Sequence, residues 1–155
     1  MESSDADIVV DSIEYPASMD HWDSFTDFTK SSITKFISDS SLAYKFFLAF
    51  EELISNIIRS SEKHSARQAT LAIRILKRNL DDKDWLVVQT VDTGIQFDPH
   101  YHQRNPVDTK QPVHERAIGG LGIFLIEQSV DCAHYQWLNG SNVNEISICI
   151  QPVSS

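Results

Sequence analysis

Residues 46–58 read FFLAFEELISNII, and this stretch decides the fold. Large apolar side chains recur in it at spacings of three and four residues, which is the period of one face of an α-helix. The apolar positions are Phe46, Phe47, Phe50, Leu53, Ile54, Ile57 and Ile58. The pattern predicts a helix that starts at residues 39–41, runs to about Glu62 and is deeply buried on one side.

Two polar residues stand at the edge of this apolar stripe. Glu52 and Asn56 are four residues apart, so they project from the same side of the helix, one turn apart. A carboxylate and an amide oxygen in that arrangement can share one hydrated magnesium ion or one reacting hydroxyl group. Taken alone, the pair also fits an exposed polar pair without a function.

The flanking segments predict the rest of the architecture. A strand is expected over residues 8–15, ending at Pro16, followed by a helix that Ser18 caps and that reaches Ile37. Alternating apolar residues predict an antiparallel hairpin from residues 69–78 and 85–91, and two final strands at 133–138 and 145–150. This order of elements predicts an α+β fold, a two-layer sandwich in which helices cover one face of the sheet.

A long polar stretch and two short motifs lie between these elements. Residues 98–118 contain prolines, charges and histidines without apolar periodicity, which is typical of an active-site lid or binding loop. The strand at 85–91 leads into Asp92-Thr93-Gly94, where a buried carboxylate could accept a hydrogen bond from an exocyclic amine such as that of adenine. Gly119-Gly120-Leu121-Gly122 opens a third helix, whose bare backbone amides could bind phosphate. A simple turn and close helix packing remain the alternatives for these two motifs.

Length and charge narrow the possible functions. The 155 residues fit one domain spanning 1–155. Residues 1–62 hold twelve acidic and four basic residues, a net charge of −8, which disfavours nucleic-acid binding because that needs clustered Lys and Arg. This acidic part is either a solvated surface or a docking face for a basic protein. No apolar run is long enough for a membrane span, and the first residues lack an export signal, so we expect a cytoplasmic protein without membrane contact.

The three motifs together resemble the GHKL family of ATP-binding domains, which have the Bergerat fold. Residues 50–56 look like the N box of that family, 92–99 like its first glycine box and 115–123 like its second. The likeness is closest to the bacterial anti-sigma-factor serine kinases, which Asp131, Tyr135 and the segment 144–148 also resemble. It covers nearly the whole chain and implies a mixed, mostly antiparallel sheet backed by three helices.

The resemblance also implies a role for each site residue. Glu52 would be the general base, Asn56 would coordinate Mg²⁺, Asp92 would hold the adenine amine and Gly94 would let the base approach. The remaining nucleotide contacts would come from the lid end and the last strand, namely Arg116, Gly119, Gly120, Leu121, Gly122 and Asn144. The implied reaction is transfer of the ATP γ-phosphoryl group to a serine of an anti-sigma antagonist of the STAS type, by a homodimer that also binds a sigma factor.

The chain departs from those kinases just after the N box. Arg59 and Ser60 stand where the kinases usually carry a His-Gly pair, and Gln96 replaces a frequent glycine. Arg59 is close enough in sequence to reach a phosphate or to compete with the metal for Glu52. The sequence therefore leaves two functions open: a serine kinase, and an ATP-binding regulatory module that sequesters a protein partner without phosphorylating it.

Overall fold

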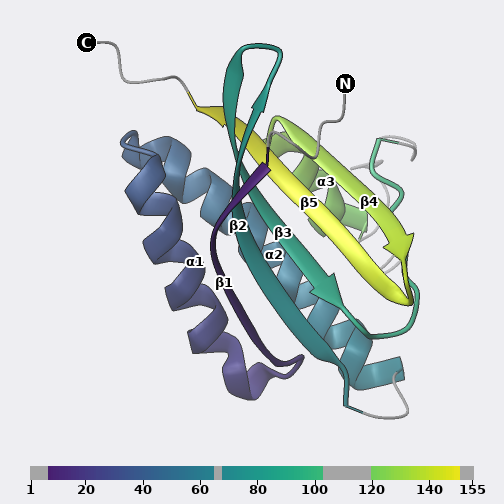
Figure 1. Ribbon diagram of the computed structural model, residues 1–155. Coiled ribbons are helices and arrows are strands. Elements are labelled where there is room, and N and C mark those ends of the chain that lie inside the picture. Colours follow the sequence, from purple (N-terminus) through teal and green to yellow (C-terminus); the bar gives the residue numbers. More distant parts are fainter. Residues whose placement is uncertain (1–6, 65–67, 103–119, 151–155) are drawn as a thin grey trace.

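The computed structural model describes residues 7–64, 68–102 and 120–150. It is a two-layer α+β sandwich whose helices all lie on one face of a five-stranded sheet (Figure 1). The elements in chain order are β1 (Asp7–Pro16), a short 3-10 helix (Met19–His21), α1 (Trp22–Phe36), α2 (Ser40–His64), β2 (Thr70–Leu80), β3 (Lys83–Asp92), α3 (Gly120–Ser129), β4 (Cys132–Leu138) and β5 (Ser141–Ile150).

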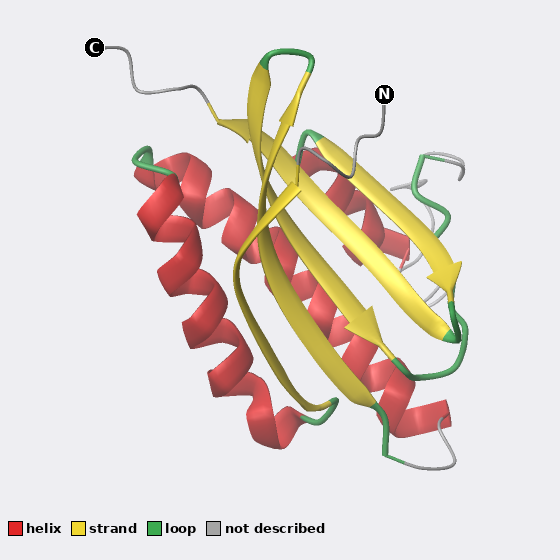
Figure 2. Cartoon of the chain, in the orientation of Figure 1, coloured by secondary structure: helices red, strands yellow, loops and turns green. Residues whose placement is uncertain are grey.

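The strands are arranged in the order β1-β2-β3-β5-β4, and each pairs antiparallel with its neighbours (Figure 2). The expected sandwich with one covered face is confirmed. The sheet is antiparallel at every described pairing, where we expected a mixed, mostly antiparallel one. Tight hairpins join β2 to β3 and β4 to β5, and such connections produce antiparallel neighbours.

The start of α2 agrees with the sequence, whereas the expectation that Ser18 caps α1 is wrong. The Ser18 hydroxyl accepts a hydrogen bond from the Asp20 backbone N–H at 3.1 Å, which caps a 3-10 turn rather than α1 itself. The Asp39 carboxylate accepts from the N–H groups of Ser41 and Leu42 and so caps α2. Helix α2 thus begins beside the predicted residue and extends slightly past Glu62.

The core lies between α2 and the middle of the sheet. The apolar stripe of α2 is buried as its spacing predicts, and it faces alternate residues of β2, β3 and β5. Side chains with no exposed surface include Phe46, Phe50, Ile54 and Ile58 of α2, together with Leu71, Ile73, Ile75, Leu86, Val88 and Ile146 of the sheet. No helix among the described residues is long and apolar enough to cross a membrane.

Two hairpin turns are shorter than predicted. Asp81 and Asp82 both have positive φ, and so do Asn139 and Gly140, so each pair forms the two-residue turn that suits a twisted hairpin. The strands expected at 133–138 and 145–150 leave Asn142 in the connection between them. The tighter turn moves Asn142 into β5, which decides the composition of the site.

Candidate functional site

The core face of the sheet changes from apolar to polar at one end. In β3 the core-facing residues run from Leu86 and Val88 to Thr90 and Asp92. Thr90 pairs with Asn144 of β5, and Asp92 pairs with Asn142. All four side chains at this end are therefore polar, and each residue is at most 4% exposed. Buried polar side chains persist when they have partners or a function, so this end of the sheet is the candidate site.

Asp92 presents a carboxylate with one committed oxygen. Its Oδ1 accepts hydrogen bonds from the Gly94 backbone N–H at 3.0 Å and from the Asn142 side-chain amide at 2.9 Å. None of the described residues donates to Oδ2. Burial raises the pKa of Asp92, and the hydrogen bonds from Asn142 and Gly94 partly oppose that rise. The free oxygen can accept a hydrogen bond from a ligand amine.

Asn142 holds the end of the sheet together. Its Nδ2 donates to Asp92 Oδ1 and to the Ile95 carbonyl oxygen, each at 2.9 Å. Its Oδ1 accepts from the Phe97 N–H at 2.9 Å and from the Tyr135 hydroxyl at 2.7 Å. Both donors and both acceptor positions of the amide are thus used. Sequence reasoning missed this residue, although the Asn139-Gly140 pair signals a two-residue turn that would have placed it in the strand.

Asn144 is hydrogen-bonded to a residue near the end of the described segment 68–102. Its Oδ1 accepts a hydrogen bond from the Tyr101 hydroxyl at 3.0 Å, and it lies one pleat away from Asp92. Asn144 lines the same cavity as Asp92. Its contact with the adenine base stays a prediction. Tyr101 belongs to the described start of the expected lid; Glu127 of α3 also fixes this segment by accepting from the His102 N–H at 2.7 Å.

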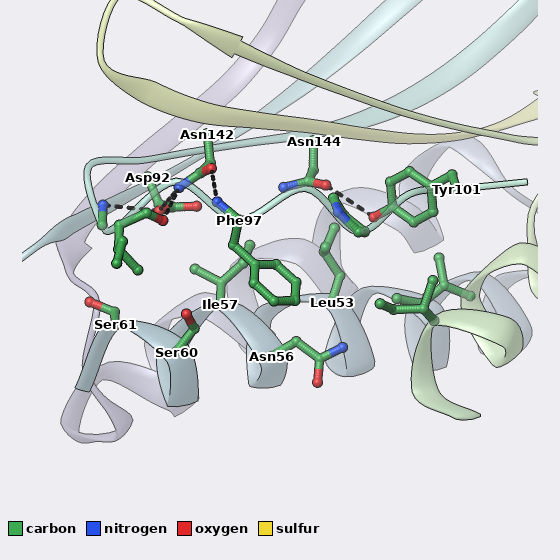
Figure 3. A pocket seen from close by; sticks show the side chains of 15 residues that line it. Leu53, Asn56, Ile57, Ser60, Ser61, Asp92, Phe97, Tyr101, Asn142 and Asn144 are labelled. Atoms are coloured by element: carbon green, nitrogen blue, oxygen red, sulfur yellow. Dashed lines mark hydrogen bonds between the residues drawn. The ribbon is translucent and has the colours of Figure 1, made fainter. Parts of the chain in front are cut away.

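Helix α2 forms the opposite wall of the site (Figure 3). Its residues facing the sheet across the cavity are Leu53, Asn56, Ile57, Ser60 and Ser61. The cavity has a volume of about 30 Å³, which is room for about one water molecule. The Phe97 ring, although 51% exposed, points toward α2 in this view. A purine can therefore enter only if side chains that line the cavity move.

Glu52 lies beside the first turn of α3. A Cβ atom added at Gly122 would overlap the Glu52 carboxylate, so the two helices approach each other closely there. The glycine leaves room for the carboxylate next to the amino end of α3, where free backbone N–H groups favour anions. Gly120 also belongs to this turn. The Leu121 side chain is 47% exposed, so Leu121 takes part in the turn through its backbone. Two predicted contact residues, Arg116 and Gly119, lie outside the described residues.

Arg59 contacts the oxygen that we assigned to the metal. Its Nη2 donates to Asn56 Oδ1 at 3.0 Å and lies 4.0 Å from Glu52 Oε2. The guanidinium is 62% exposed, so solvent screens it and it can swing away. Asn56 and Glu52 offer two oxygens one turn apart, a donor set that suits Mg²⁺ with water and phosphate as its other ligands. The residues present therefore fit the ion once Arg59 has moved.

The site is a slot with chemically distinct ends. Asp92 and Ser61 line the cavity at one end, whereas Glu52 and Gly122 approach each other at the other end, outside the cavity lining. Nine residues of α2 separate Glu52 from Ser61, which corresponds to roughly 14 Å at the helical rise of about 1.5 Å per residue. An elongated ligand with an amine at one end and an anionic group at the other matches this arrangement.

A comparison with models of protein families identifies a related domain. The family model of the histidine kinase-like ATPase domain matches residues 15–150, which includes every site residue named above. None of the curated proteins compared with the chain matches it significantly.

Proposed function

Because the chain belongs to the family of histidine kinase-like ATPase domains, and so is an ATP-binding domain, we propose that it is a protein serine/threonine kinase of the anti-sigma type. Its substrate would be a serine of an anti-sigma antagonist with a STAS domain, and a sigma factor would be its second partner. The observation that carries the proposal is the position of the Glu52 carboxylate against Gly122 at the amino end of α3. A base in that place is next to the site where the terminal phosphate of ATP would lie.

Each side chain of the slot has a task in this reaction. Asp92 Oδ2 accepts a hydrogen bond from the adenine amine, and the first turn of α3 receives the phosphates through its N–H groups. Glu52 takes the proton of the substrate hydroxyl. At the same time the hydroxyl oxygen bonds to the γ-phosphorus, and the bond between that phosphorus and ADP breaks. Asn56 would hold Mg²⁺, which would neutralise charge on the phosphates when bound.

The Glu52 carboxylate also supports the choice of a hydroxyl substrate. It is one-third exposed, so a partner protein can reach it from outside. General-base catalysis typically contributes about a hundred- to ten-thousandfold in rate. Loss of this carboxylate should therefore abolish most of the transfer without removing the base-binding end of the slot.

The test is phosphoryl transfer from Mg-ATP to STAS-domain proteins, with ATP affinity measured in parallel by calorimetry. We expect Glu52→Ala to lose at least a hundredfold in transfer rate while its ATP affinity changes less than tenfold. Glu51→Ala is the matched control, because Glu51 is the adjacent carboxylate and faces a different groove, between α1 and α2. Equal transfer by parent and Glu52→Ala would overturn the role of this residue.

The hydrogen bond from Arg59 to Asn56 favours a second candidate function. A chain that keeps its own cation on the metal-binding oxygen could bind nucleotide yet sequester its protein partner without phosphorylating it. The same assay separates the two candidates. ATP binding without transfer to any STAS partner, but with ATP-dependent complex formation, supports the sequestering module.

A further inference from the structure

Ser61 has a buried hydroxyl without a hydrogen-bond partner. The residue is 4% exposed, and none of the described residues bonds its Oγ. A serine within a helix usually donates to the carbonyl oxygen four residues earlier, and Ser61 makes not even that bond. A buried hydroxyl without a partner destabilises the folded state. Such a group calls for an explanation, and a ligand that accepts its hydrogen bond is one.

The place of Ser61 identifies the part of the ligand that it would meet. It lines the same cavity as Asp92, Gly94 and Asn142, at the end of the slot far from Glu52. Figure 3 shows it on α2, across the cavity from Asp92 of β3. Since the free Oδ2 of Asp92 accepts an amine in the proposed function, a donor near it would meet the atoms beside that amine.

We propose that Ser61 is a specificity-determining residue, whose hydroxyl donates a hydrogen bond to a purine ring nitrogen next to the amine that Asp92 binds. This inference rests on the proposed ATP site. It adds a second contact to the base, made by α2 from the side opposite the sheet.

The chemistry of adenine fits this pair of contacts. Its exocyclic amine is a donor, and the ring nitrogens on either side of that position, N1 and N7, are acceptors. Asp92 and Ser61 would thus present an acceptor and a donor to the base. Guanine carries a carbonyl oxygen at the same position and a protonated N1, so it would face the Asp92 carboxylate with an acceptor. The two residues together would select 6-aminopurines.

The test combines one substitution with ligands that lack single nitrogens. Calorimetry would measure the affinities of the parent and Ser61→Ala for ATP, 1-deaza-ATP, 7-deaza-ATP and GTP. We expect Ser61→Ala to bind ATP about five- to tenfold more weakly, which is the range for one lost hydrogen bond. For the analogue that lacks the contacted nitrogen, parent and variant should bind equally.

Stability provides a second readout that a purely structural serine would not share. Removing the unpartnered hydroxyl should leave the nucleotide-free protein as stable as the parent, or more stable, while ATP binding weakens. Thr29→Val is the matched control. Thr29 of α1 also has a fully buried hydroxyl without a partner, and it does not line the slot. That variant should keep the parent's ATP affinity.

The outcomes separate this inference from the proposed function. If the parent binds ATP and Ser61→Ala binds it within twofold of the parent, the Ser61 contact is wrong and the ATP site stands. If the parent discriminates against neither deaza analogue, the contact is wrong as well, whatever the variant does. If the parent binds no ATP, the proposed function fails first.

Discussion

Replacing Asn142 with alanine tests whether one amide organises the base end of the slot. The substitution removes four hydrogen bonds, two donated to Asp92 and Ile95 and two accepted from Phe97 and Tyr135. A hydrogen bond contributes about 0.5–1.5 kcal/mol on average. Phe97 and Tyr135 are partly exposed, so water can replace some of the lost bonds. We expect the free energy of unfolding to fall by roughly 2–4 kcal/mol.

The same substitution should change how Asp92 titrates. The hydrogen bond from Asn142 stabilises the ionised carboxylate, so its loss raises the pKa of Asp92 further above the ordinary value. A larger fraction of the carboxyl is then protonated at a given mildly acidic pH, and the protonated form binds an amine less well. The ATP affinity of Asn142→Ala should therefore be below that of the parent. As the solution is acidified, this affinity should begin to decline at a higher pH than it does in the parent.

The assay pairs urea unfolding with calorimetric ATP titrations across a range of pH. Asn144→Ala is the matched control, since Asn144 has the same side chain, strand, face and 3% exposure, and its Oδ1 accepts from Tyr101 instead of bonding Asp92. It should lose less stability and keep the parent's pH profile. If both variants lose the same stability and share one pH profile, Asn142 has no special part in orienting Asp92.

Three further predictions concern the rest of the slot. The substitution Gly122→Ala should change the free energy of unfolding by less than about 1 kcal/mol, because the Glu52 carboxylate is the mobile end of a side chain and can move. The same substitution should reduce the rate of phosphoryl transfer at least tenfold while ATP affinity stays unchanged. ATP affinity should fall as the pH falls through the raised pKa of Asp92. The free energy of unfolding should rise over the same pH range, because the folded chain then binds a proton that the unfolded chain lacks. The substitution Asp92→Asn should flatten both pH dependences. The substitution Arg59→Ala should increase the effect of Mg²⁺ on ATP affinity by about two- to fivefold, because it frees Asn56 Oδ1. The substitution Arg59→Lys should give an intermediate effect. An unchanged effect of Mg²⁺ would contradict competition between Arg59 and the ion for Asn56.

Local patterns were sufficient to predict most of the fold. The stripe around Phe50 and Ile54 predicted α2 and its buried side, because helical periodicity is a property of neighbouring residues. Asp39 and Ser18 acted as caps for a similar reason, since capping involves residues two or three positions apart. The mixed sheet came from the family resemblance alone. The tight turns at Asp81 and Asn139 fix the direction of only two strand pairs, β2 with β3 and β4 with β5, whereas the direction of the other two pairs depends on longer connections.

The site was predicted where its chemistry is local and missed where it depends on pairing between strands. Glu52 and Asn56 share a helix, so their spacing alone placed them on one side. Asn142 meets Asp92 only through the register of β3 with β5, fifty residues apart in sequence. Shifting that register by one residue would point Asn142 away from the slot, and no local pattern fixes such a register.

The change from apolar to polar core-facing residues along two paired strands is nevertheless visible in the sequence. In β5 the core-facing positions change from Ile148 and Ile146 to Asn144 and Asn142, while β3 changes from Val88 to Asp92. Either strand alone would place polar groups in the core at a cost in stability. Paired antiparallel, both strands put their polar residues at the same end of the sheet, where Asn142 bonds Asp92. None of the described residues bonds Asp92 Oδ2, the Thr90 hydroxyl or the Ser61 hydroxyl. Asp92 and Ser61 line one cavity, and a ligand with a donor beside an acceptor would bond both.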